Sequence, residues 1–575
     1  MTKLISISDL SYRPESFPSG KPDILQDINL DIEEGSFIAI IGRNGSGKTT
    51  LIKHINGLLV PSRGKVEVAG LDTRQLENHP ELRSLVGMVF QNPSDQIVAS
   101  TVEEDVAFGL ENLNLPSEII QKEVFKQLEK ADLLEEAKRP PHLLSGGQIQ
   151  RLALAGVLAR QPKIILFDEP TSMLDPLTRK AFLDRVCKLH RNGMTILYIT
   201  HHMEEAFFAD KIIVIDEGKI LLTGSPENVF KQSQLLYEIG LDIPEAAAYA
   251  QSLRGTGLPI PDNIFTPDAL LDSLPEYQGS KTDIQPLSSD DDLVEMIIDL
   301  QNVHYTYLAG TPLSIKALQG ADLEVQEGII QGIAGTNGSG KSTLLQHING
   351  LLRPSQGMVR VDFLMVEDPA TSLREIVKKV GLVFQNPETQ FFEVFVGDEI
   401  AFGPKQFEFD NIRDRVNKAM ALVGLNFETY KDRRLETLSS GEKRKVALAS
   451  TLILDQEILL FDEPTAGMDP KSRDELLALF KKLQKQGKTI LISSHRLDEI
   501  AKITHALSVM KSGIVVKTSP THDILFNNKI INESGLSVPL IVEIVQKLKE
   551  KGWPIEFSSC LSLEQLTSAM KEKMI

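Results

Sequence analysis

Gly42-Arg43-Asn44-Gly45-Ser46-Gly47-Lys48-Thr49 is the stretch that decides the fold of this chain, and Gly335-Thr336-Asn337-Gly338-Ser339-Gly340-Lys341-Ser342 repeats it. Both match G-x-x-x-x-G-K-[ST], in which a glycine-rich loop between a strand and a helix cradles nucleotide phosphates. Each copy follows an apolar run and precedes a helix-like run, such as residues 50–55. The sequence therefore predicts two nucleotide sites.

Polar residues downstream of the two loops repeat at one spacing. Lys48 and Lys341 stand 293 residues apart, and each later marker stands 294 residues from its copy. These markers are Gln91 and Gln385, Ser145 and Ser439, Asp168 and Asp462, Glu169 and Glu463, and His201 and His495. The repetition predicts two nucleotide-hydrolysing modules that work as a pair.

Length and composition restrict the class of protein. A chain of 575 residues exceeds one hydrophobic core, so at least two domains are expected. No run of about 18 apolar residues is present, and the first residues alternate like a strand, so we expect a cytosolic chain whose membrane role comes through partners. The net charge of −18 argues against a nucleic-acid partner, and two cysteines are too few for a disulfide framework or a metal cluster.

Apolar strand-like runs alternate with helix-like segments in both halves. The runs 37–42 and 164–168 are apolar throughout, which is typical of parallel strands buried on both faces. An α/β fold is therefore predicted for each module. Gly240-Leu241 and Gly257 recur as Gly535-Leu536 and Gly552, which indicates a small repeated subdomain after each module. The predicted division is 1–235 for the first module, 236–274 for its subdomain, 275–296 for an acidic linker, 297–525 for the second module and 526–575 for its subdomain.

The phosphate loops supply the first set of candidate residues. Their backbone N–H groups form an anion nest, Lys48 and Lys341 add a charge, and Thr49 and Ser342 offer a hydroxyl to Mg²⁺. The predicted nucleotide contacts are Gly42, Asn44, Gly45, Ser46, Gly47, Lys48, Thr49 and Thr50, and Gly335, Asn337, Gly338, Ser339, Gly340, Lys341, Ser342 and Thr343.

Two carboxylates follow each central strand. Asp168 and Asp462 end apolar strands, where a carboxylate is costly unless it meets a cation or hydrogen-bond donors, so a Mg²⁺ contact is predicted. Glu169 and Glu463 come next and are predicted to polarise an attacking water. An acidic pair that only caps a helix is the alternative interpretation.

A serine and two glycines at a helix start make a second type of anion site. Leu144-Ser145-Gly146-Gly147-Gln148 precedes a helix-like run. Because the phosphate loop already wraps its own nucleotide, this segment is predicted to engage the nucleotide of the other module.

With these motifs the chain resembles the ATP-binding-cassette family over roughly residues 1–235 and 297–525. The resemblance implies ATP and Mg²⁺ as ligands, head-to-tail cassettes, catalytic Glu169 and Glu463, and switch histidines His201 and His495. It implies one site made of Lys48, Thr49, Gln91, Asp168, Glu169 and His201 with Ser439 and Gly441, and another made of Lys341, Ser342, Gln385, Asp462, Glu463 and His495 with Ser145 and Gly147. The further ATP contacts that it implies are Gly146, Gln148 and Ser440. The implied Mg²⁺ ligands are Thr49, Gln91, Asp168, Ser342, Gln385 and Asp462. The implied D-loops are residues 172–175 and 466–469.

The chain departs from the family pattern in two places. The second signature contains Ser440 and Glu442 in place of glycine and an uncharged residue, so we predict that the site using Ser439 is the weaker hydrolytic site. Tyr307 is the predicted adenine-stacking residue of the second module. Pro14 stands at that place in the first, and Tyr12 or Phe17 remains open as a substitute.

The segments 89–96, 101–109, 383–390 and 396–403 look like the ATPase subunits of energy-coupling-factor importers of cobalt and vitamins, and the fusion resembles chains of thiamine-precursor uptake. This resemblance implies a transmembrane coupling subunit, a small substrate-binding membrane subunit and a peripheral position at the cytoplasmic face of the cell membrane. The acids expected to flank the docking cleft are Glu103, Glu104, Asp105, Asp398 and Glu399. An exporter ATPase and a soluble twin cassette acting on ribosomes or nucleic acid are the alternatives, and the transported substrate stays open.

Overall fold

The computed structural model describes residues 3–14, 22–113, 115–172, 174–277, 295–311, 314–466, 468, 470–554 and 560–574. The chain divides into two compact units. The first unit comprises 1–174, 178–251 and 261–270, and the second comprises 175–177, 252–260 and 271–575. The five-part division and the linker given above stay predictions, and most of the linker, Phe17 and parts of both D-loops lie outside the described residues.

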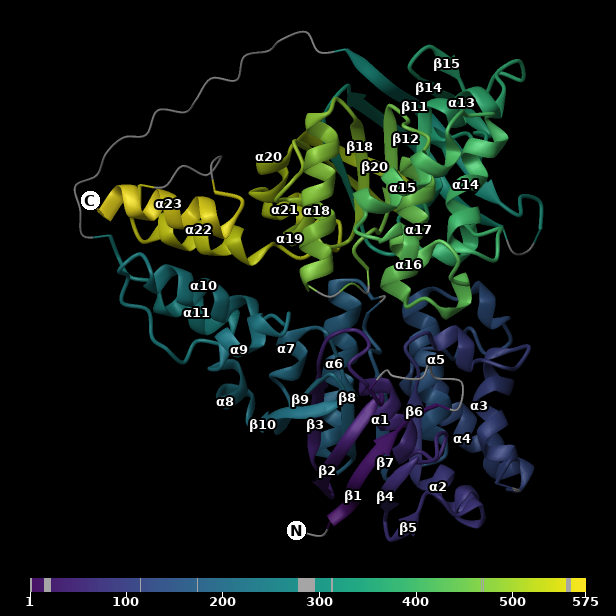
Figure 1. Cartoon of the computed structure of the whole chain (residues 1–575), viewed down its shortest axis with the longest axis vertical. Helices are drawn as coiled ribbons and strands as arrows, with labels where there is room; N and C mark the ends of the chain where they lie inside the picture. Colours follow the sequence, from purple (N-terminus) through teal and green to yellow (C-terminus); the bar gives the residue numbers. More distant parts are fainter. Residues whose placement is uncertain are drawn as a thin grey trace. The chain divides into compact units, whose positions relative to one another are not determined.

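A six-stranded, mostly parallel sheet forms the centre of the first unit (Figure 1). Its order is β10-β9-β3-β8-β7-β6, and only the edge strand β10 runs antiparallel to its neighbour. The strands are β3 (Phe37–Ile41), β6 (Val86–Val89), β7 (Ile164–Asp168), β8 (Thr195–Ile199), β9 (Lys211–Asp216) and β10 (Lys219–Gly224). Every residue of β3, β7 and β8 is buried, which explains why these strands read as continuous apolar runs.

An antiparallel sheet of order β2-β1-β4-β5 accompanies the first one. It consists of β1 (Lys3–Tyr12), β2 (Leu25–Glu33), β4 (Arg63–Val68) and β5 (Leu71–Asp72). The helices of this unit are α1 (Lys48–Ile55), α2 (His79–Leu85), α3 (Val102–Glu111), α4 (Ser117–Lys130), α5 (Gly146–Ala159), α6 (Pro176–Arg191) and α7 (Met203–Ala206).

The second unit repeats both sheets, with orders β16-β17-β18-β13-β19-β20 and β12-β11-β14-β15. Its strands are β11 (Met296–Tyr307), β12 (Ile315–Gln326), β13 (Ile330–Ala334), β14 (Gln356–Val361), β15 (Leu364–Met365), β16 (Val380–Val383), β17 (Ile458–Asp462), β18 (Thr489–Ser494), β19 (Ala506–Lys511) and β20 (Ile514–Pro520). Its helices are α12 (Lys341–Ile348), α13 (Leu373–Lys379), α14 (Val396–Gln406), α15 (Ile412–Leu422), α16 (Phe427–Tyr430), α17 (Ser440–Leu452), α18 (Pro470–Lys485) and α19 (Leu497–Ile500). The predicted α/β fold is confirmed in both copies.

Short helices follow each main sheet. They are α8 (Pro226–Phe230), α9 (Ser233–Glu238), α10 (Glu245–Arg254) and α11 (Pro267–Ser273), and later α20 (Thr521–Leu525), α21 (Asn528–Glu533), α22 (Leu540–Glu550) and α23 (Leu563–Met574). The repeated glycines Gly240 and Gly535 lie against the phosphate loops: a Cβ at Gly240 would stand 3.2 Å from the Arg43 Cδ atom, and one at Gly535 3.1 Å from the Thr336 Cγ2 atom. Each segment thus contacts the nucleotide-site loop of its own copy.

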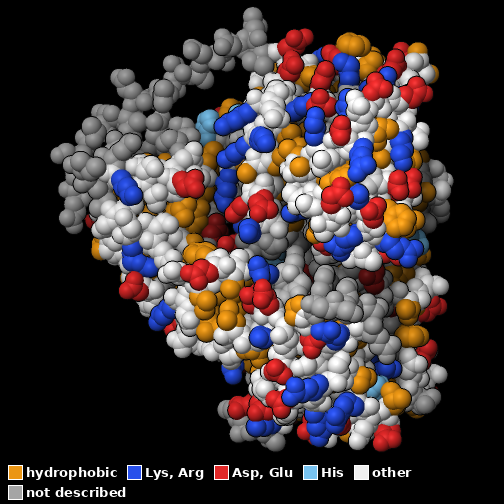
Figure 2. All heavy atoms as spheres, viewed as in Figure 1, with side chains coloured by type: hydrophobic (Ala, Val, Ile, Leu, Met, Phe, Trp, Pro, Cys, Tyr) orange, Lys and Arg blue, Asp and Glu red, His pale blue; other side chains and the backbone are white. Residues whose placement is uncertain are grey.

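The view in Figure 2 shows acidic and basic side chains interspersed over the visible face.

Aromatic side chains fill the core between each main sheet and the long helix that follows the central strand. In the second unit the Phe461 ring of β17 packs on the Phe480 ring of α18, with centroids 4.3 Å apart. Both side chains are fully buried. This contact holds β17, which ends at Asp462, in its place.

Substitution of Phe461 by alanine should lower the free energy of unfolding of this unit by about 3–5 kcal/mol, because a large buried ring is replaced by a cavity. Urea denaturation followed by circular dichroism measures the change. Phe363→Ala is the control, since Phe363 lies in the same unit and is 73% exposed, and it should have a much smaller effect on the transition. Equal effects of the two substitutions would contradict this account of the core.

Candidate nucleotide sites

The first phosphate loop joins β3 to α1 and depends on glycine geometry. Gly47 has a φ of 103°, a left-handed conformation that side chains disfavour. Gly42 lies so close to the neighbouring strand that a Cβ there would stand 2.2 Å from the Ile215 carbonyl oxygen. Lys48 is buried, and its Nζ atom donates to the carbonyl oxygens of Gly42 at 2.7 Å and Arg43 at 2.9 Å. The ammonium group is therefore held across the loop.

The second loop joins β13 to α12 in the same way. Gly340 also has a φ of 103°, and the Lys341 Nζ atom donates to Gly335 at 2.8 Å and Thr336 at 3.1 Å. In this copy the ammonium group also lies 3.4 Å from the Glu463 Oε1 atom.

One buried hydroxyl in each loop has no hydrogen-bond partner within the described parts of the chain. These groups are the Oγ atoms of Ser46 and Ser339, whose residues are 4% and 3% exposed. An unsatisfied buried hydroxyl costs about 1–3 kcal/mol. The loops are therefore suited to bind an anion that accepts hydrogen bonds from these two hydroxyl groups.

The strand-end aspartates contact the hydroxyls of the loops. The Thr49 Oγ1 atom donates to the Asp168 Oδ1 atom at 2.9 Å. Burial, reinforced by the neighbouring Glu169, raises the pKa of Asp168 to about 6. In the second copy Ser342 hydrogen-bonds Asp462, and burial raises the pKa of this aspartate also.

These oxygen donors fit Mg²⁺, which uses one or two carboxylates together with water and phosphate oxygens. Larger groups of three or more His, Cys, Asp or Glu side chains arranged for a metal do not occur within the described ranges.

Glu169 lies at the centre of the first site. Its Oε1 atom is 2.5 Å from the His201 Nε2 atom, and its Oε2 atom accepts from the Gln91 Nε2 atom at 3.0 Å. Burial acts to raise the pKa of Glu169, but His201, Lys48 and Gln91 together outweigh it, so the pKa lies below its usual value. The side chain is therefore ionised at neutral pH, as a proton acceptor must be.

Glu463 has partly different neighbours. Its Oε2 atom lies 3.0 Å from the His495 Nδ1 atom. Burial acts to raise its pKa, and His495 and Lys341 outweigh that effect and lower it. Both Gln91 and Gln385 are exposed, and the Gln91 side chain donates to Glu169 at 3.0 Å. Both Glu169 and Glu463 have a φ of 46°.

The two signature segments differ in charge. Ser145 caps α5: its Oγ atom accepts from the Gln148 N–H at 3.3 Å, its own N–H donates to the Gln148 Oε1 atom at 2.9 Å, and the Gln148 Nε2 atom donates to Glu136 at 3.0 Å. Gly146 and Gly147 form the first turn of this helix.

In the second signature Glu442 occupies the place of Gln148. Its Oε2 atom accepts from the Ser439 N–H at 2.8 Å and from the Ser439 Oγ atom at 2.9 Å. Its Oε1 atom accepts from the Tyr430 hydroxyl at 2.8 Å and from the Arg433 Nη1 atom at 3.2 Å. Burial acts to raise the pKa of Glu442, and Ser439, Tyr430 and Arg433 outweigh it, so the pKa is lowered. The acid predicted beside this loop is thus ionised, and it holds the Ser439 hydroxyl.

Aromatic residues lie at the ends of β1 and β11, where the adenine-stacking residues are predicted. The Tyr307 hydroxyl lies 3.3 Å from the Thr343 Oγ1 atom, next to Ser342 on α12. The Tyr12 ring packs edge-on against His54, with centroids 4.7 Å apart, just as Tyr305 packs against His347 at 5.0 Å. Tyr12 is therefore the counterpart of Tyr305 and not of Tyr307.

Two of the acids expected on the docking cleft have an internal role. Asp105 accepts the backbone N–H groups of Val98 at 2.9 Å and Ala99 at 3.3 Å. Glu399 is 3% exposed and accepts those of Phe392 and Glu393, both at 2.9 Å. Burial raises the pKa of both carboxyl groups. They secure the segment that leaves the Gln loop, and the prediction that they flank a docking cleft stays a prediction.

Glu205 and Glu499 were missed by motif-based reasoning. Glu205 is 2% exposed and accepts from the hydroxyls of Thr171 and Thr200, both at 2.6 Å, while the Glu499 carboxylate accepts from Thr465 at 2.5 Å. They join the loops after two neighbouring strands. Their spacing of 294 residues, shared with the catalytic markers, could have identified them.

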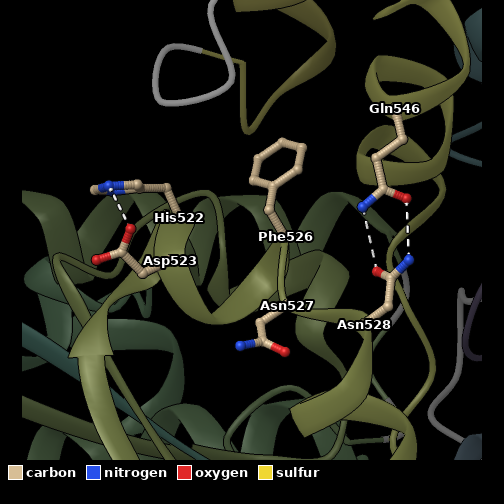
Figure 3. Close-up of a pocket in the computed structure, with 6 residues that line it drawn as sticks. All are labelled: His522, Asp523, Phe526, Asn527, Asn528 and Gln546. Carbon is tan, nitrogen blue, oxygen red and sulfur yellow. Dashed lines mark hydrogen bonds and ion pairs between the residues drawn. The ribbon is translucent and has the colours of Figure 1, made fainter. Parts of the chain in front are cut away.

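A surface hollow elsewhere in the second unit contains none of the predicted site residues. It is lined by His522, Asp523, Phe526, Asn527, Asn528 and Gln546 (Figure 3). The Asn528 and Gln546 amides donate to each other at 3.2 Å, and the His522 Nε2 atom lies 3.1 Å from the Asp523 Oδ1 atom.

Several known proteins have similar sequences. The ABC transporter family model matches residues 25–172 and 318–466. A protein of Caldanaerobacter subterraneus named as an ABC transporter ATP-binding protein, TTE1589, is 33% identical over 584 residues, which cover 99% of each chain. The energy-coupling factor transporter ATP-binding protein EcfA1 of the same organism is 46% identical over 273 residues, 47% of this chain and 99% of that protein.

A solved structure of cbiO1 from Clostridium perfringens, part of the ABC transporter complex cbiONQ, is 32% identical and covers 44% of this chain and 99% of its own, with a TM-score of 0.37. In the described part of the present chain, none of the helices has the length and hydrophobicity to cross a membrane. Two matched cassettes and a relative aligned over nearly its full length establish that this chain belongs to the ABC transporter ATP-binding proteins, whose cassettes bind ATP and hydrolyse it coupled to transport.

Proposed function

We propose that this chain is the ATP-hydrolysing subunit of an energy-coupling-factor type importer for a vitamin or a metal ion. The observation that carries the catalytic part is the duplicated contact of Glu169 with His201 and of Glu463 with His495, each beside a buried loop lysine. The importer part is supported by the 46% identity with EcfA1 over one half of the chain.

We assign ATP phosphate binding to the two loops and Mg²⁺ binding to the pairs Thr49–Asp168 and Ser342–Asp462, with Gln91 and Gln385 as further ligands. A bound Mg²⁺ would neutralise charge on the β- and γ-phosphates. Two observations support the assignment. The buried loop hydroxyls have no hydrogen-bond partner in the described residues, so they can donate to a phosphate. The raised pKa of Asp168 indicates that its buried carboxylate is not fully compensated by its neighbours, so a bound cation would stabilise it.

Proton transfer is assigned to the two glutamates. Glu169 is ionised and within 2.5 Å of His201, so it can take a proton from an attacking water while the histidine orients its carboxylate. Glu463 and His495 do the same in the second copy, where the carboxylate also lies beside Lys341.

Head-to-tail closure of the cassettes is proposed from the sequence resemblance alone. In that arrangement Ser439 serves the site of Lys48, and Ser145 serves the site of Lys341. The Ser439 hydroxyl donates to the carboxylate of Glu442 in its own copy, so it is less available to a phosphate than the Ser145 hydroxyl.

A transmembrane coupling subunit and a small substrate-binding membrane subunit are the proposed partners, at the cytoplasmic face of the membrane. Exposed apolar side chains support a docking surface beyond each Gln loop: Val98 is 64% exposed and Phe392 is 74% exposed. The exposed acids Glu104 and Asp398 are the candidates for ion pairs with a partner, although Glu104 also accepts the Thr101 N–H at 3.0 Å and Asp398 also pairs with Lys405 at 3.2 Å.

Asp168→Asn should stabilise the ligand-free protein at pH 8. Because folding raises the pKa of Asp168 from 3.8 to about 6, its ionised form opposes folding at high pH by roughly 2–3 kcal/mol. The gain should shrink as the pH falls from 8 to 5, since Asp168 then becomes protonated in the folded state. Urea titrations at both pH values measure it, and Mg²⁺-dependent hydrolysis at the first site should be lost. Destabilisation at pH 8 would contradict the account.

Glu169→Gln should reduce ATP hydrolysis less than Glu463→Gln, because the site of Glu169 depends on the signature that contains Glu442. In the Glu463→Gln background, Glu442→Gln should raise the residual rate, since glutamine keeps the helix cap that Gln148 makes but frees the Ser439 hydroxyl. Steady-state phosphate release measures all variants. The reverse ordering of the two glutamate variants would refute the asymmetry.

Purification of the full chain from native membranes in detergent should recover a transmembrane protein and a small membrane protein. Glu104→Lys combined with Asp398→Lys should reduce this recovery, most strongly at low salt, because the proposed ion pairs become repulsive. Glu34→Lys with Glu327→Lys is the matched control, since both residues are exposed and occupy equivalent turns of the two copies. Recovery that is unchanged, or ribosomes in place of membrane proteins, counts against the importer.

A further inference from the structure

Arg444 lies on α17, five residues after the signature Ser439, and is 9% exposed. Its Nη1 atom donates to the Glu463 carbonyl oxygen at 3.2 Å and also to that of Pro464, and its Nη2 atom donates to the Gln385 carbonyl oxygen at 3.0 Å. One guanidinium group therefore joins the backbone of the catalytic strand end to the backbone of the Gln loop.

The planar guanidinium is suited to this role because its donors form a fixed fork. Burial lowers the pKa of Arg444 to about 10, which still leaves the group charged at neutral pH. A buried charge is tolerated only when its donors are satisfied, and here three carbonyl oxygens accept from it.

Further polar contacts tie the same Gln loop to α17. The Gln390 Nε2 atom donates to the Ala447 carbonyl oxygen at 3.1 Å, and Lys443 forms an ion pair with Glu388. In the first copy Ile149 stands at the place of Lys443, so the ion pair has no equivalent there.

Gln150 stands at the place of Arg444 in the first copy. It is 2% exposed, and its Nε2 atom lacks a hydrogen-bond partner in the described part of the structure. The Gln150 side chain is shorter than that of arginine, is uncharged, and lacks the fixed array of donors of a guanidinium group. Its Gln loop is positioned differently, through the Gln91 side chain on Glu169.

We infer that Arg444 is a positioning residue that couples the signature helix α17 to the Gln loop and the catalytic glutamate of the second copy only. A displacement of α17 then moves Gln385 and Glu463 together, whereas the first copy lacks this link. The inference rests on the proposed catalytic roles of Glu463 and Gln385.

Hydrogen–deuterium exchange of the full chain tests the link without relying on activity. Arg444→Gln should raise exchange in residues 384–390 about tenfold or more, toward the rate of residues 90–96, because a loop loses its anchor to α17. Lys443→Ile, the matched control, should raise exchange less than Arg444→Gln, since it removes one ion pair whose Glu388 partner is 60% exposed.

Kinetics in the Glu169→Gln background, which isolates the second site, should show kcat lowered about tenfold by Arg444→Gln with KM for ATP changed less than about twofold. The kcat of Arg444→Lys should lie between those of the Glu169→Gln background and of Arg444→Gln, because an ammonium group cannot reach all three carbonyl oxygens. Arg444→Lys is also the variant to measure if Arg444→Gln does not fold.

Unchanged exchange in residues 384–390 overturns the inference, as does an equal rise throughout the second unit, which would make Arg444 merely structural. Faster local exchange with unchanged kcat overturns the coupling. Wild-type protein without ATP hydrolysis would instead defeat the proposed function, while leaving the exchange result interpretable.

Discussion

A carboxylate held out of water at the end of a parallel strand governs the organisation of both sites. Asp168 and Asp462 are 4% and 5% exposed, and each is stabilised by hydroxyl donors and by the field of the neighbouring lysine. Such a group is costly unless a cation or donors are close. The strand, the glycine loop and the helix that begins at the lysine all serve to bring those partners to one edge of the sheet.

Much of this arrangement could be predicted from the sequence, because it depends on local patterns. Continuous apolar runs predicted the positions of the central strands, and the glycine–lysine pattern predicted the positions of the phosphate loops. The contact of Thr49 with Asp168 follows once both lie at the carboxyl edge of the same parallel sheet, after the strands β3 and β7 that flank β8. The repeat at constant spacing distinguished functional motifs from chance matches, since chance seldom reproduces five polar markers in the same order.

Other features depend on contacts that no local pattern encodes. Asp105 and Glu399 read as surface acids on a helix, yet they accept backbone N–H groups from the preceding loop. In the sequence Glu442 is an acid with no evident partner, but in the structure its carboxylate accepts hydrogen bonds from Arg433 and Tyr430. The three carbonyl contacts of Arg444 join segments far apart in the chain, and only the folded backbone brings them together. Sequence predicts such a residue only as a polar position on an amphipathic helix.

The backbone of the two glutamates proposed as catalytic limits which residues can replace them. At a φ of 46°, Glu169 and Glu463 occupy a conformation that glycine, asparagine and aspartate tolerate and β-branched residues do not. A short polar residue at either position therefore keeps the backbone conformation at the end of the strand. Loss of the carboxylate and loss of the fold are thus separable changes at these two positions.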